Sequence, residues 1–308
     1  MKFLIVGTLT NPSKRLKTDL KSILGAIGEG FEAEVHLIES DSKKSSLKYL
    51  HEVSLETKNF SFRSLGYLKS GIPERVERIR YSRNHYVNFI RENYPERLWD
   101  WIIVADLDGM NSKLSASGLI SSIDLLQTYD AVFANQKFGY YDLYALREKK
   151  WMPKDPIVQF YEKVLEINEN NEFNNLHKFR LRREIFRAKT NLVFDKMLKL
   201  NENLPPIEVD SAFGGLGIYN PKVFLECDYS PIDESITQSE HVDLHLKARK
   251  LEFKLAINPR MVNSNYNTHN INRIRIIRIF RAHPIYLFLR KALNLKLKTR
   301  SKVEFPSA

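Results

Sequence analysis

An uninterrupted apolar run at residues 101–105 constrains the fold of this chain more than any other feature, because it ends directly in the acidic pair Asp106 and Asp108. An apolar run without alternation is typical of a strand that is buried on both faces of a mainly parallel sheet. In open α/β sheets, ligands bind in the crevice beyond the carboxyl ends of such strands. The sequence therefore predicts an α/β fold in which two carboxylates stand at a ligand-binding edge.

The elements expected around this strand agree with a doubly wound α/β domain, with helices flanking the central sheet. Strands are expected at 2–7, 34–39, 131–134, 209–219 and 253–257, and helices at 13–27, 73–94 and 117–127. Residues 155–200 are expected to form a mostly helical insert with a strongly basic stretch at 179–187. The predicted organisation is a main domain at 1–270, which carries this insert, followed by basic amphipathic helices at 271–308.

Composition restricts both the kind of fold and the cellular compartment that are to be expected. The chain has 308 residues, 43% of them hydrophobic, so a large core is possible and wholesale disorder is not expected. The single cysteine, Cys227, permits no intrachain disulfide and no cysteine-based zinc cluster, which fits a reducing compartment. The apolar run at 3–6 is too short for a secretory signal, and no uncharged apolar run has membrane-spanning length. We therefore expect a cytoplasmic protein.

The net charge of +11 favours anionic partners, and most of it belongs to the tail. The segment 273–302 carries ten Lys and Arg and no Asp or Glu. On a helical projection one side gathers the apolar residues Ile276, Ile277, Ile279 and Phe280, and Arg275, Arg278 and Arg281 point largely away, although Arg273 and Ile274 depart from the pattern. Helices of this form lie in the membrane interface with their cations toward anionic headgroups. The tail thus predicts peripheral attachment to an anionic surface on the inner face of the membrane. The alternative is that these helices pack on the main domain and their arginines are only solvated.

The same charge suggests a basic nucleic-acid-binding module as a second class of function. Such modules interleave basic residues with exposed aromatic side chains on a platform. The tail instead alternates Arg with Ile and Phe. We therefore expect no nucleic-acid partner.

The acidic pair is compatible with two kinds of chemistry. Two carboxylates that flank one apolar residue can approach a divalent cation from one loop, and Mg²⁺ and Mn²⁺ prefer oxygen ligands that substrate phosphates complete. An apolar strand followed by Asp-Leu-Asp-Gly at 106–109 also resembles the nucleophile loop of haloacid-dehalogenase-like phosphatases. That chemistry needs a downstream Lys and a second acidic pair, and no convincing acidic pair follows here. A third interpretation is that the two carboxylates only cap a strand before a turn.

Two further groups of residues can serve the same site. Arg80, Arg83 and Asn84 share one face of the helix expected before the acidic strand. Their side chains would contact a diphosphate or the acidic loop, or else form part of a solvated basic face. Gly214 and Gly215 are expected within a strand, where paired glycines indicate either a ligand close to the backbone or a tight turn.

The last candidates lie near the carboxyl end of the main domain. Glu240 opens an expected helix, where it would serve as a base or positioning group, or only complement the helix dipole. His241 and His245 have a spacing that can bind metal, but the segment offers no evident third ligand. His269 lies in a polar loop after the last strand, and an isolated loop histidine is usually only solvated.

The order of these motifs resembles the layout of the GT-A glycosyltransferases. The stretch from 80 to 245, a little over half the chain, more narrowly resembles the capsule-associated α-1,3-mannosyltransferase-like group and its bacterial relatives. The motifs that carry this resemblance are Arg83-Asn84, Tyr140-Tyr141-Asp142 with Ala145-Leu146-Arg147, and Glu240-His241. The basic insert at 155–200 has no counterpart in that pattern, which leaves the acceptor open.

The resemblance implies transfer of a hexose from a nucleotide diphosphate sugar to a glycan or lipid-linked glycan in surface polysaccharide biosynthesis. It implies that Asp106 and Asp108 hold Mn²⁺ or Mg²⁺, with His269 as a third ligand. The residues implied to meet the donor are Gly7, Thr8, Arg80, Arg83, Asp106, Gly214 and Gly215. Glu240 and Asp210 are the implied catalytic carboxylates, with Glu240 as the base of an inverting reaction or a positioning group in a retaining one.

Overall fold

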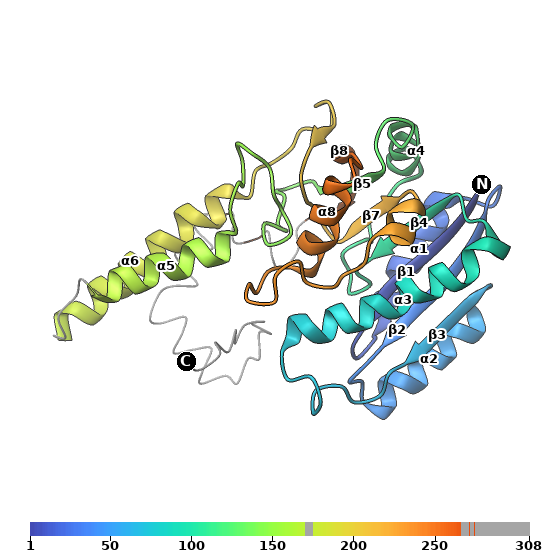
Figure 1. The fold of residues 1–308 in the computed structure, drawn as a ribbon, viewed down its shortest axis with the longest axis horizontal. Coiled ribbons are helices and arrows are strands. Elements are labelled where there is room, and N and C mark those ends of the chain that lie inside the picture. The colour runs from blue at the N-terminus through green and yellow to red at the C-terminus, as the bar shows by residue number, and fades with distance from the viewer. Residues whose placement is uncertain (170–174, 266–270, 272–273, 275–308) are drawn as a thin grey trace.

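The structure is a computed structural model that describes residues 1–169, 175–265, 271 and 274. Within these residues an eight-stranded sheet forms the centre of the molecule, in the order β3-β2-β1-β4-β7-β5-β8-β6 (Figure 1). The strands are β1 (Lys2–Leu9), β2 (Glu32–Glu39), β3 (Phe60–Ser64), β4 (Trp101–Ala105), β5 (Ala131–Gln136), β6 (Ile207–Glu208), β7 (Leu216–Tyr219) and β8 (Leu255–Ser264).

The sheet is mainly parallel, as the apolar run at β4 predicts. β3, β2, β1 and β4 pair in parallel, and so do β5 and β8. Only β7, which lies between β4 and β5, and the short β6 run antiparallel to their neighbours. The carboxyl ends of β4, β5 and β8 therefore meet the start of β7 at one edge of the sheet.

Helices cover both faces of the sheet, which confirms the expected α/β class. One face packs on α1 (Lys14–Ile27), α2 (Lys44–Glu56) and α4 (Ala116–Leu125), through buried residues such as Leu20, Leu50 and Leu119. The other face packs on α3 (Arg75–Arg97), α7 (Lys222–Glu226) and α8 (Glu240–Lys250), through residues such as Tyr86, Phe224 and Leu244. The strands thus lie between two separate apolar layers, and this burial is the main stabilising contribution to the fold.

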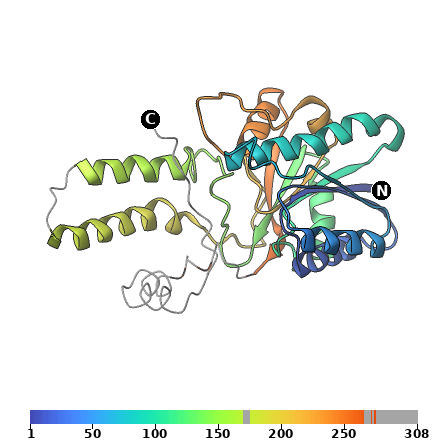
Figure 2. The same cartoon turned by 90° about the horizontal axis from the view of Figure 1, so that it is seen from below.

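The expected helical insert is a pair of helices, α5 (Pro156–Glu169) and α6 (Asn175–Leu192), followed by the 3₁₀ helix η1 (Phe194–Lys196). The two helices pack on each other and project away from the sheet (Figure 2). No helix of the described residues is long and apolar enough to cross a membrane. Apart from Ile271 and Ile274, the tail at 271–308 lies outside the described residues.

Two details of the sequence prediction are wrong. The strand expected at 209–219 begins only at Leu216, because Gly214 and Gly215 adopt φ angles of +67° and +84° that end an extended conformation. The paired glycines thus form a turn before the strand. α2 and α7 were not expected, and only two residues of α2, Leu50 and Val53, are buried, which leaves a weak periodic signal.

Candidate functional site

The loop that carries Asp106 and Asp108, the acidic loop, begins where β4 ends. The start of β7 lies at the same edge of the sheet. The backbone N–H of Asp106 donates a 2.9 Å hydrogen bond to the carbonyl of Gly215. The Asn111 amide donates to the carbonyl of Asp106 over 2.6 Å. The Asp106 side chain is 39% exposed and Asp108 is exposed, so both carboxylates remain accessible to a ligand.

A buried carboxylate on α1 fixes the return of this loop. Asp19 is fully buried and accepts the N–H groups of Gly109 at 2.6 Å and Asn111 at 3.0 Å. Burial raises the pKa of Asp19 to about 6, although both N–H groups oppose that rise. Asp19 therefore holds the loop in place, a role that its position in an amphipathic helix did not reveal.

A network of buried side-chain amides holds the turn at Gly214 and Gly215, the glycine turn, in place. The Asn263 side-chain amide donates to the carbonyl of Gly214 and to the side-chain oxygen of Asn111, each over 2.9 Å. Gln136 also donates to the Gly214 carbonyl, at 2.9 Å. A Cβ atom on Gly214 would lie 2.6 Å from the carbonyl oxygen of Ala134. The turn therefore requires glycine for its own packing, and its contact with a donor sugar stays a prediction.

Arg83 links the acidic loop to the start of α8. Its Nε donates to Glu240 over 3.0 Å, and its Nη2 lies 3.6 Å from an oxygen of Asp106. The guanidinium lies between the rings of Phe213 and Tyr229, with its central carbon 5.4 and 5.5 Å from their centroids. Arg83 is 3% exposed, so it does not belong to a solvated basic face.

The other two residues of that helix face have structural partners. Arg80 is buried and pairs with Asp243 on α8 and with Glu77 one turn earlier on α3. Asn84 accepts the backbone N–H of Tyr229 over 2.9 Å. These contacts anchor α8 and the segment before it onto α3, while a contact between Arg80 and a donor stays a prediction.

Glu240 and His241 are adjacent residues at the start of α8, which Arg83 connects to the acidic loop. Glu240 is 7% exposed, and its carboxylate lies 3.7 Å from Nε2 of His241. The His241 ring stacks on Phe213 at a centroid distance of 3.8 Å, and within the described residues its nitrogens accept or donate no hydrogen bond. Burial, helped by the charge of Arg83, lowers the pKa of His241 far below its usual range. A neutral imidazole therefore packs next to the Glu240 carboxylate.

His245 is committed to structure and does not complete a metal site with His241. Its Nδ1 lies 3.0 Å from the Ser211 hydroxyl, and its Nε2 lies 3.0 Å from the Tyr219 hydroxyl. Burial lowers its pKa to about 3. Both nitrogens of His245 thus have hydroxyl partners, so His245 does not bind a metal together with His241, as the lack of an evident third ligand in the sequence suggested.

Asp210 lies away from Glu240 along α8. Its carboxylate is 3.4 Å from Nε of Arg249, nine residues beyond Glu240. A helix rises 1.5 Å per residue, so the two ends of this span are roughly 13 Å apart. The structure thus pairs Asp210 with Arg249 and brings it into no described contact with the acidic loop, and its catalytic role stays a prediction.

Asp142 is a further carboxylate near the site, for which the sequence predicted no catalytic or binding role. It is partly buried and accepts the N–H of Gly214 over 3.1 Å. Burial raises its pKa to about 6; the Gly214 N–H opposes the rise, and the charge of Glu240 adds to it. The neighbouring Tyr141 hydroxyl lies at the glycine turn, 3.0 Å from where a Cβ of Gly215 would be. The tyrosine-aspartate segment at 140–142 was the only sequence signal for these two side chains.

Gly7 and Thr8 lie near the end of β1, next to the start of the acidic loop. A Cβ atom on Gly7 would lie 2.5 Å from the carbonyl oxygen of Ala105, so glycine is needed for the close approach of the two strands. Thr8 is partly exposed at the same edge. Their assignment to nucleotide contacts stays a prediction.

Within the described residues, the two carboxylates at the acidic loop need further ligands to hold a divalent cation. Asp106 and Asp108 offer the oxygen donors that Mg²⁺ and Mn²⁺ prefer. Over residues 1–169 and 175–265, no group of three His, Cys, Asp or Glu side chains is arranged to hold a metal ion. His269, the candidate third ligand, lies outside the described residues. Among the described residues the loop therefore supplies only part of a coordination shell, which fits a cation that is shared with phosphate oxygens.

Comparison with known proteins finds similarity only at the level of structure. No protein-family model matches the sequence, and no curated protein matches it. A mannosyltransferase from Pyrobaculum calidifontis, solved with GDP-Man and Mn²⁺, is 10% identical over 95% of this chain and 64% of its own, with a TM-score of 0.42. Residues 1–349 of TarS from S. aureus, solved with UDP-GlcNAc, are 14% identical over 97% and 77%, with a TM-score of 0.43.

A third solved chain covers less of the molecule. GalNAc-T7, solved with UDP, GalNAc and Mn²⁺, is 15% identical over 87% of this chain and 44% of its own, with a TM-score of 0.46. This chain therefore spans less than two thirds of the length of the mannosyltransferase and of GalNAc-T7. Because all three TM-scores are below 0.5, the activity has to be argued from the residues of this chain.

Proposed function

We propose that this protein is a GT-A glycosyltransferase that transfers a hexose from a nucleotide diphosphate sugar to a hydroxyl group of a glycan or lipid-linked glycan. One observation carries the proposal: the convergence of Asp106 and Asp108, the Arg83–Glu240 pair and the glycine turn at one edge of the sheet. This is the edge where open α/β sheets bind ligands.

The residues of the site divide into a donor side and an acceptor side. Asp106 and Asp108 would hold Mn²⁺ or Mg²⁺, which neutralises charge on the departing nucleoside diphosphate when it is bound. Glu240 is held in one orientation by Arg83, so it can accept the proton of the attacking hydroxyl if the reaction inverts, or position the sugar if it retains. The stacked and buried rings of Phe213 and His241 lie next to this pair, Phe213 against Arg83 and His241 against Glu240.

The phosphatase alternative has less support. A nucleophilic aspartate of that class needs a lysine and further acidic residues for its metal. Within the described residues Asp106 is 3.6 Å from Arg83, and no cluster of three acidic or metal-binding side chains surrounds it.

The proposal is tested by thermal unfolding of the full-length protein with GDP, UDP and ADP, each with and without Mn²⁺. A ligand that binds only the native state stabilises it, by about 2.7 kcal/mol at a hundred times its Kd. We expect one nucleoside diphosphate to raise the Tm in the presence of Mn²⁺ and not in its absence. Asp108→Ala should remove the shift, while Asp124→Ala, which removes an exposed carboxylate from α4, should keep it. A Tm that no nucleotide raises would contradict a nucleotide-sugar donor.

A further inference from the structure

A cavity of about 540 Å³ opens at the same sheet edge as the acidic loop, between the start of α4 and the carboxyl-terminal part of β8. The residues that line it include Lys113, Ser115, Lys137, Glu202, Arg260 and Val262. Its volume lies in the range of small-molecule sites, roughly 300–1,000 Å³. Its lining is polar, however, with a single apolar side chain, Val262, so it suits a hydrated ligand and not an apolar one.

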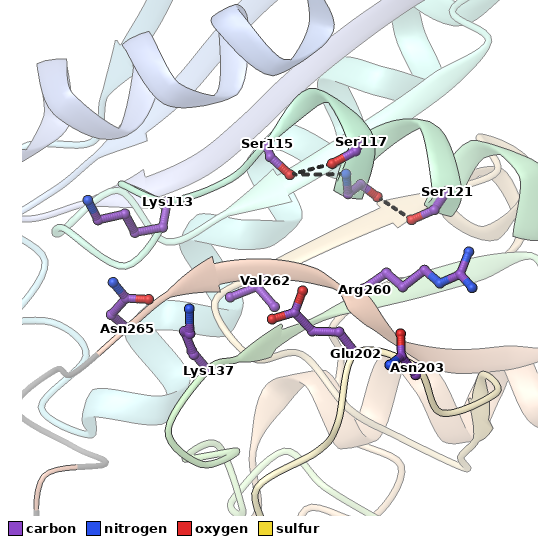
Figure 3. A pocket seen from close by; sticks show the side chains of 11 residues that line it. Lys113, Ser115, Ser117, Ser121, Lys137, Glu202, Asn203, Arg260, Val262 and Asn265 are labelled. Carbon is purple, nitrogen blue, oxygen red and sulfur yellow. Dashed lines mark hydrogen bonds between the residues drawn. The ribbon is translucent and has the colours of Figure 1, made fainter.

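The charges in this cavity are unbalanced. Figure 3 shows Lys113 and Lys137 toward one end, Arg260 toward the other, and Glu202 between them. Over the part of the chain that the structure describes, the side chains of the three cations form no ion pair or hydrogen bond. Three cations against one carboxylate favour an anionic ligand, and arginine in particular matches the planar geometry of phosphate and carboxylate groups.

The amino-terminal end of α4 forms one wall of the cavity and adds partial positive charge and hydrogen-bond donors to the three cations. Ser115 caps α4 by accepting the N–H of Gly118 over 3.1 Å, and its hydroxyl lies 3.1 Å from that of Ser117. The amino-terminal end of this ten-residue helix therefore faces the cavity, where its partial positive charge favours an anion. The hydroxyls of Ser115 and Ser117 share one hydrogen bond, so one of their two hydrogens remains for a sugar or phosphate oxygen, whereas Ser121 already donates to the carbonyl of Gly118 over 2.9 Å (Figure 3).

A short chain of hydrogen bonds connects this cavity to the proposed catalytic site. The backbone of Lys113 donates to the carbonyl of Asn263 over 2.9 Å, and the Asn263 side chain donates to Asn111 over 2.9 Å. Asn111 in turn donates to the carbonyl of Asp106 over 2.6 Å. A ligand in the cavity would therefore lie beside the acidic loop but outside the Arg83–Glu240 cluster.

We propose that this cavity binds an anionic group, a phosphate or a carboxylate, of the acceptor glycan. The assignment to the acceptor rests on the proposed function, because that function places the donor diphosphate at Asp106 and Asp108, and the cavity lies beside this loop and not within it. The binding of a sugar anion as such rests on the cavity alone and does not depend on transfer.

The test is a titration of the full-length protein, followed by NMR, with three sugars: glucose 6-phosphate, glucuronate and glucose. Wild type should bind either or both of the charged sugars more tightly than glucose. The double variant Lys137→Gln/Arg260→Gln should weaken that binding about two- to thirtyfold, since it removes two of the three cations of the lining and exposed charge pairs contribute modestly. Glu202→Gln should strengthen it, because it removes the one carboxylate in the lining. The preferred sugar identifies the anion as phosphate or carboxylate.

A matched control is Lys222→Gln/Lys254→Gln, which removes two exposed cations just after β7 and just before β8, at the opposite edge of the sheet. Equal affinity in the two double variants, or charged sugars that bind no better than glucose, would overturn the proposal. So would a loss of nucleoside diphosphate binding in Lys137→Gln/Arg260→Gln, since the cavity would then belong to the donor. Charged-sugar binding at the cavity in a protein without any transferase activity would instead contradict the proposed function and retain the anion site.

Discussion

Nε of Arg83 donates a 3.0 Å hydrogen bond to Glu240, joining two residues that are 157 positions apart in the chain. Both residues are more than nine-tenths buried. The same guanidinium lies 3.6 Å from Asp106. One cation thus connects the helix before the acidic strand, the acidic loop and the start of α8, and it stabilises two carboxylates that would otherwise repel each other.

Removal of this cation should reduce both stability and activity. Arg83→Gln leaves Glu240 buried without its counter-charge, and breaking a buried pair in this way costs about 3–5 kcal/mol. Arg83→Lys keeps the charge but cannot contact two carboxylates with one planar fork, so we expect a smaller loss of stability and a clear loss of turnover. Urea unfolding and a donor-turnover assay measure the two effects. The control is Arg182→Gln, at an exposed position on α6; if Arg83→Gln is as stable as that control, the bridge does not stabilise the fold.

A substitution at Asp108 tests its proposed role as a metal ligand, because this change should have little effect on folding. Its side chain is exposed, so Asp108→Ala should leave the free energy of unfolding within about 0.5 kcal/mol of wild type. Transfer should be abolished, and an excess of chelator should abolish it in wild type as well. Asp124→Ala is again the matched control. A folded Asp108→Ala protein with full activity, or a wild-type protein indifferent to the chelator, would exclude Asp108 as a metal ligand.

Glu240→Gln distinguishes a catalytic carboxylate from a helix-start carboxylate. If Glu240 is the base of an inverting reaction, turnover should fall by about 10²–10⁴-fold while donor affinity is retained. The amide of Gln can still pack against Arg83 and His241, so large structural changes are not expected. A loss of less than about tenfold would assign Glu240 to helix-dipole stabilisation. The anomeric configuration of the product then separates the base role from the positioning role.

The sequence predicted the fold correctly where the hydrophobic pattern of a segment reflects the burial of that segment. The run at 101–105 is apolar at every position because both faces of β4 are covered, and that alone indicated a mainly parallel sheet with Asp106 and Asp108 at its edge. The glycine turn was misplaced into a strand, since paired glycines fit a bulge and a turn equally well. Positive φ angles at both residues could not be read from their identity alone.

The partners within the site were not predictable, because they depend on how distant elements pack. Nothing in the spacing of Arg80 and Arg83 indicates that Arg80 pairs with Asp243 while Arg83 reaches Glu240. Asp19 looks like an ordinary polar position of an amphipathic helix, yet it is fully buried under the acidic loop. Asn263 gave no motif at all, since buried amide networks are set by three-dimensional contacts and not by sequence period.

Membrane attachment through the tail concerns residues outside the described ranges and stays a prediction. Each cation near an anionic surface contributes about 1 kcal/mol. Replacing Arg275, Arg278 and Arg281 by Gln in the full-length chain should therefore weaken co-sedimentation with phosphatidylserine vesicles by up to roughly two orders of magnitude. The control replaces three exposed arginines of α6, namely Arg182, Arg183 and Arg187. Equal loss in both variants, or binding that ignores the anionic lipid content, would exclude the tail as the anchor.

The neutral state of His245 should make the stability of the protein depend on pH in a defined direction. His245 is fully buried between the hydroxyls of Ser211 and Tyr219, and burial, with a smaller contribution from the charge of Arg83, lowers its pKa to about 3. Its unfolded value is about 6.5. A pKa that is lower in the folded state means that the unfolded chain binds the proton more readily. The contribution of His245 is therefore fully present above pH 6.5 and is lost as the pH falls toward 3.

His245→Gln isolates this effect, because an amide can still meet a hydroxyl but does not titrate. Two other buried histidines also have a lowered pKa, His36 to about 4 and His241 far below its usual range. Both are present in the two proteins, so their contributions cancel in the difference. We expect the stability advantage of wild type over His245→Gln to shrink by up to about 3 kcal/mol between pH 6.5 and pH 4, at 1.36 kcal/mol per pH unit. Urea unfolding of both proteins at four pH values measures it. An advantage that stays constant would show that folding does not shift the pKa of His245, and one that grows toward acid would show that folding raises it; either result contradicts the lowered pKa.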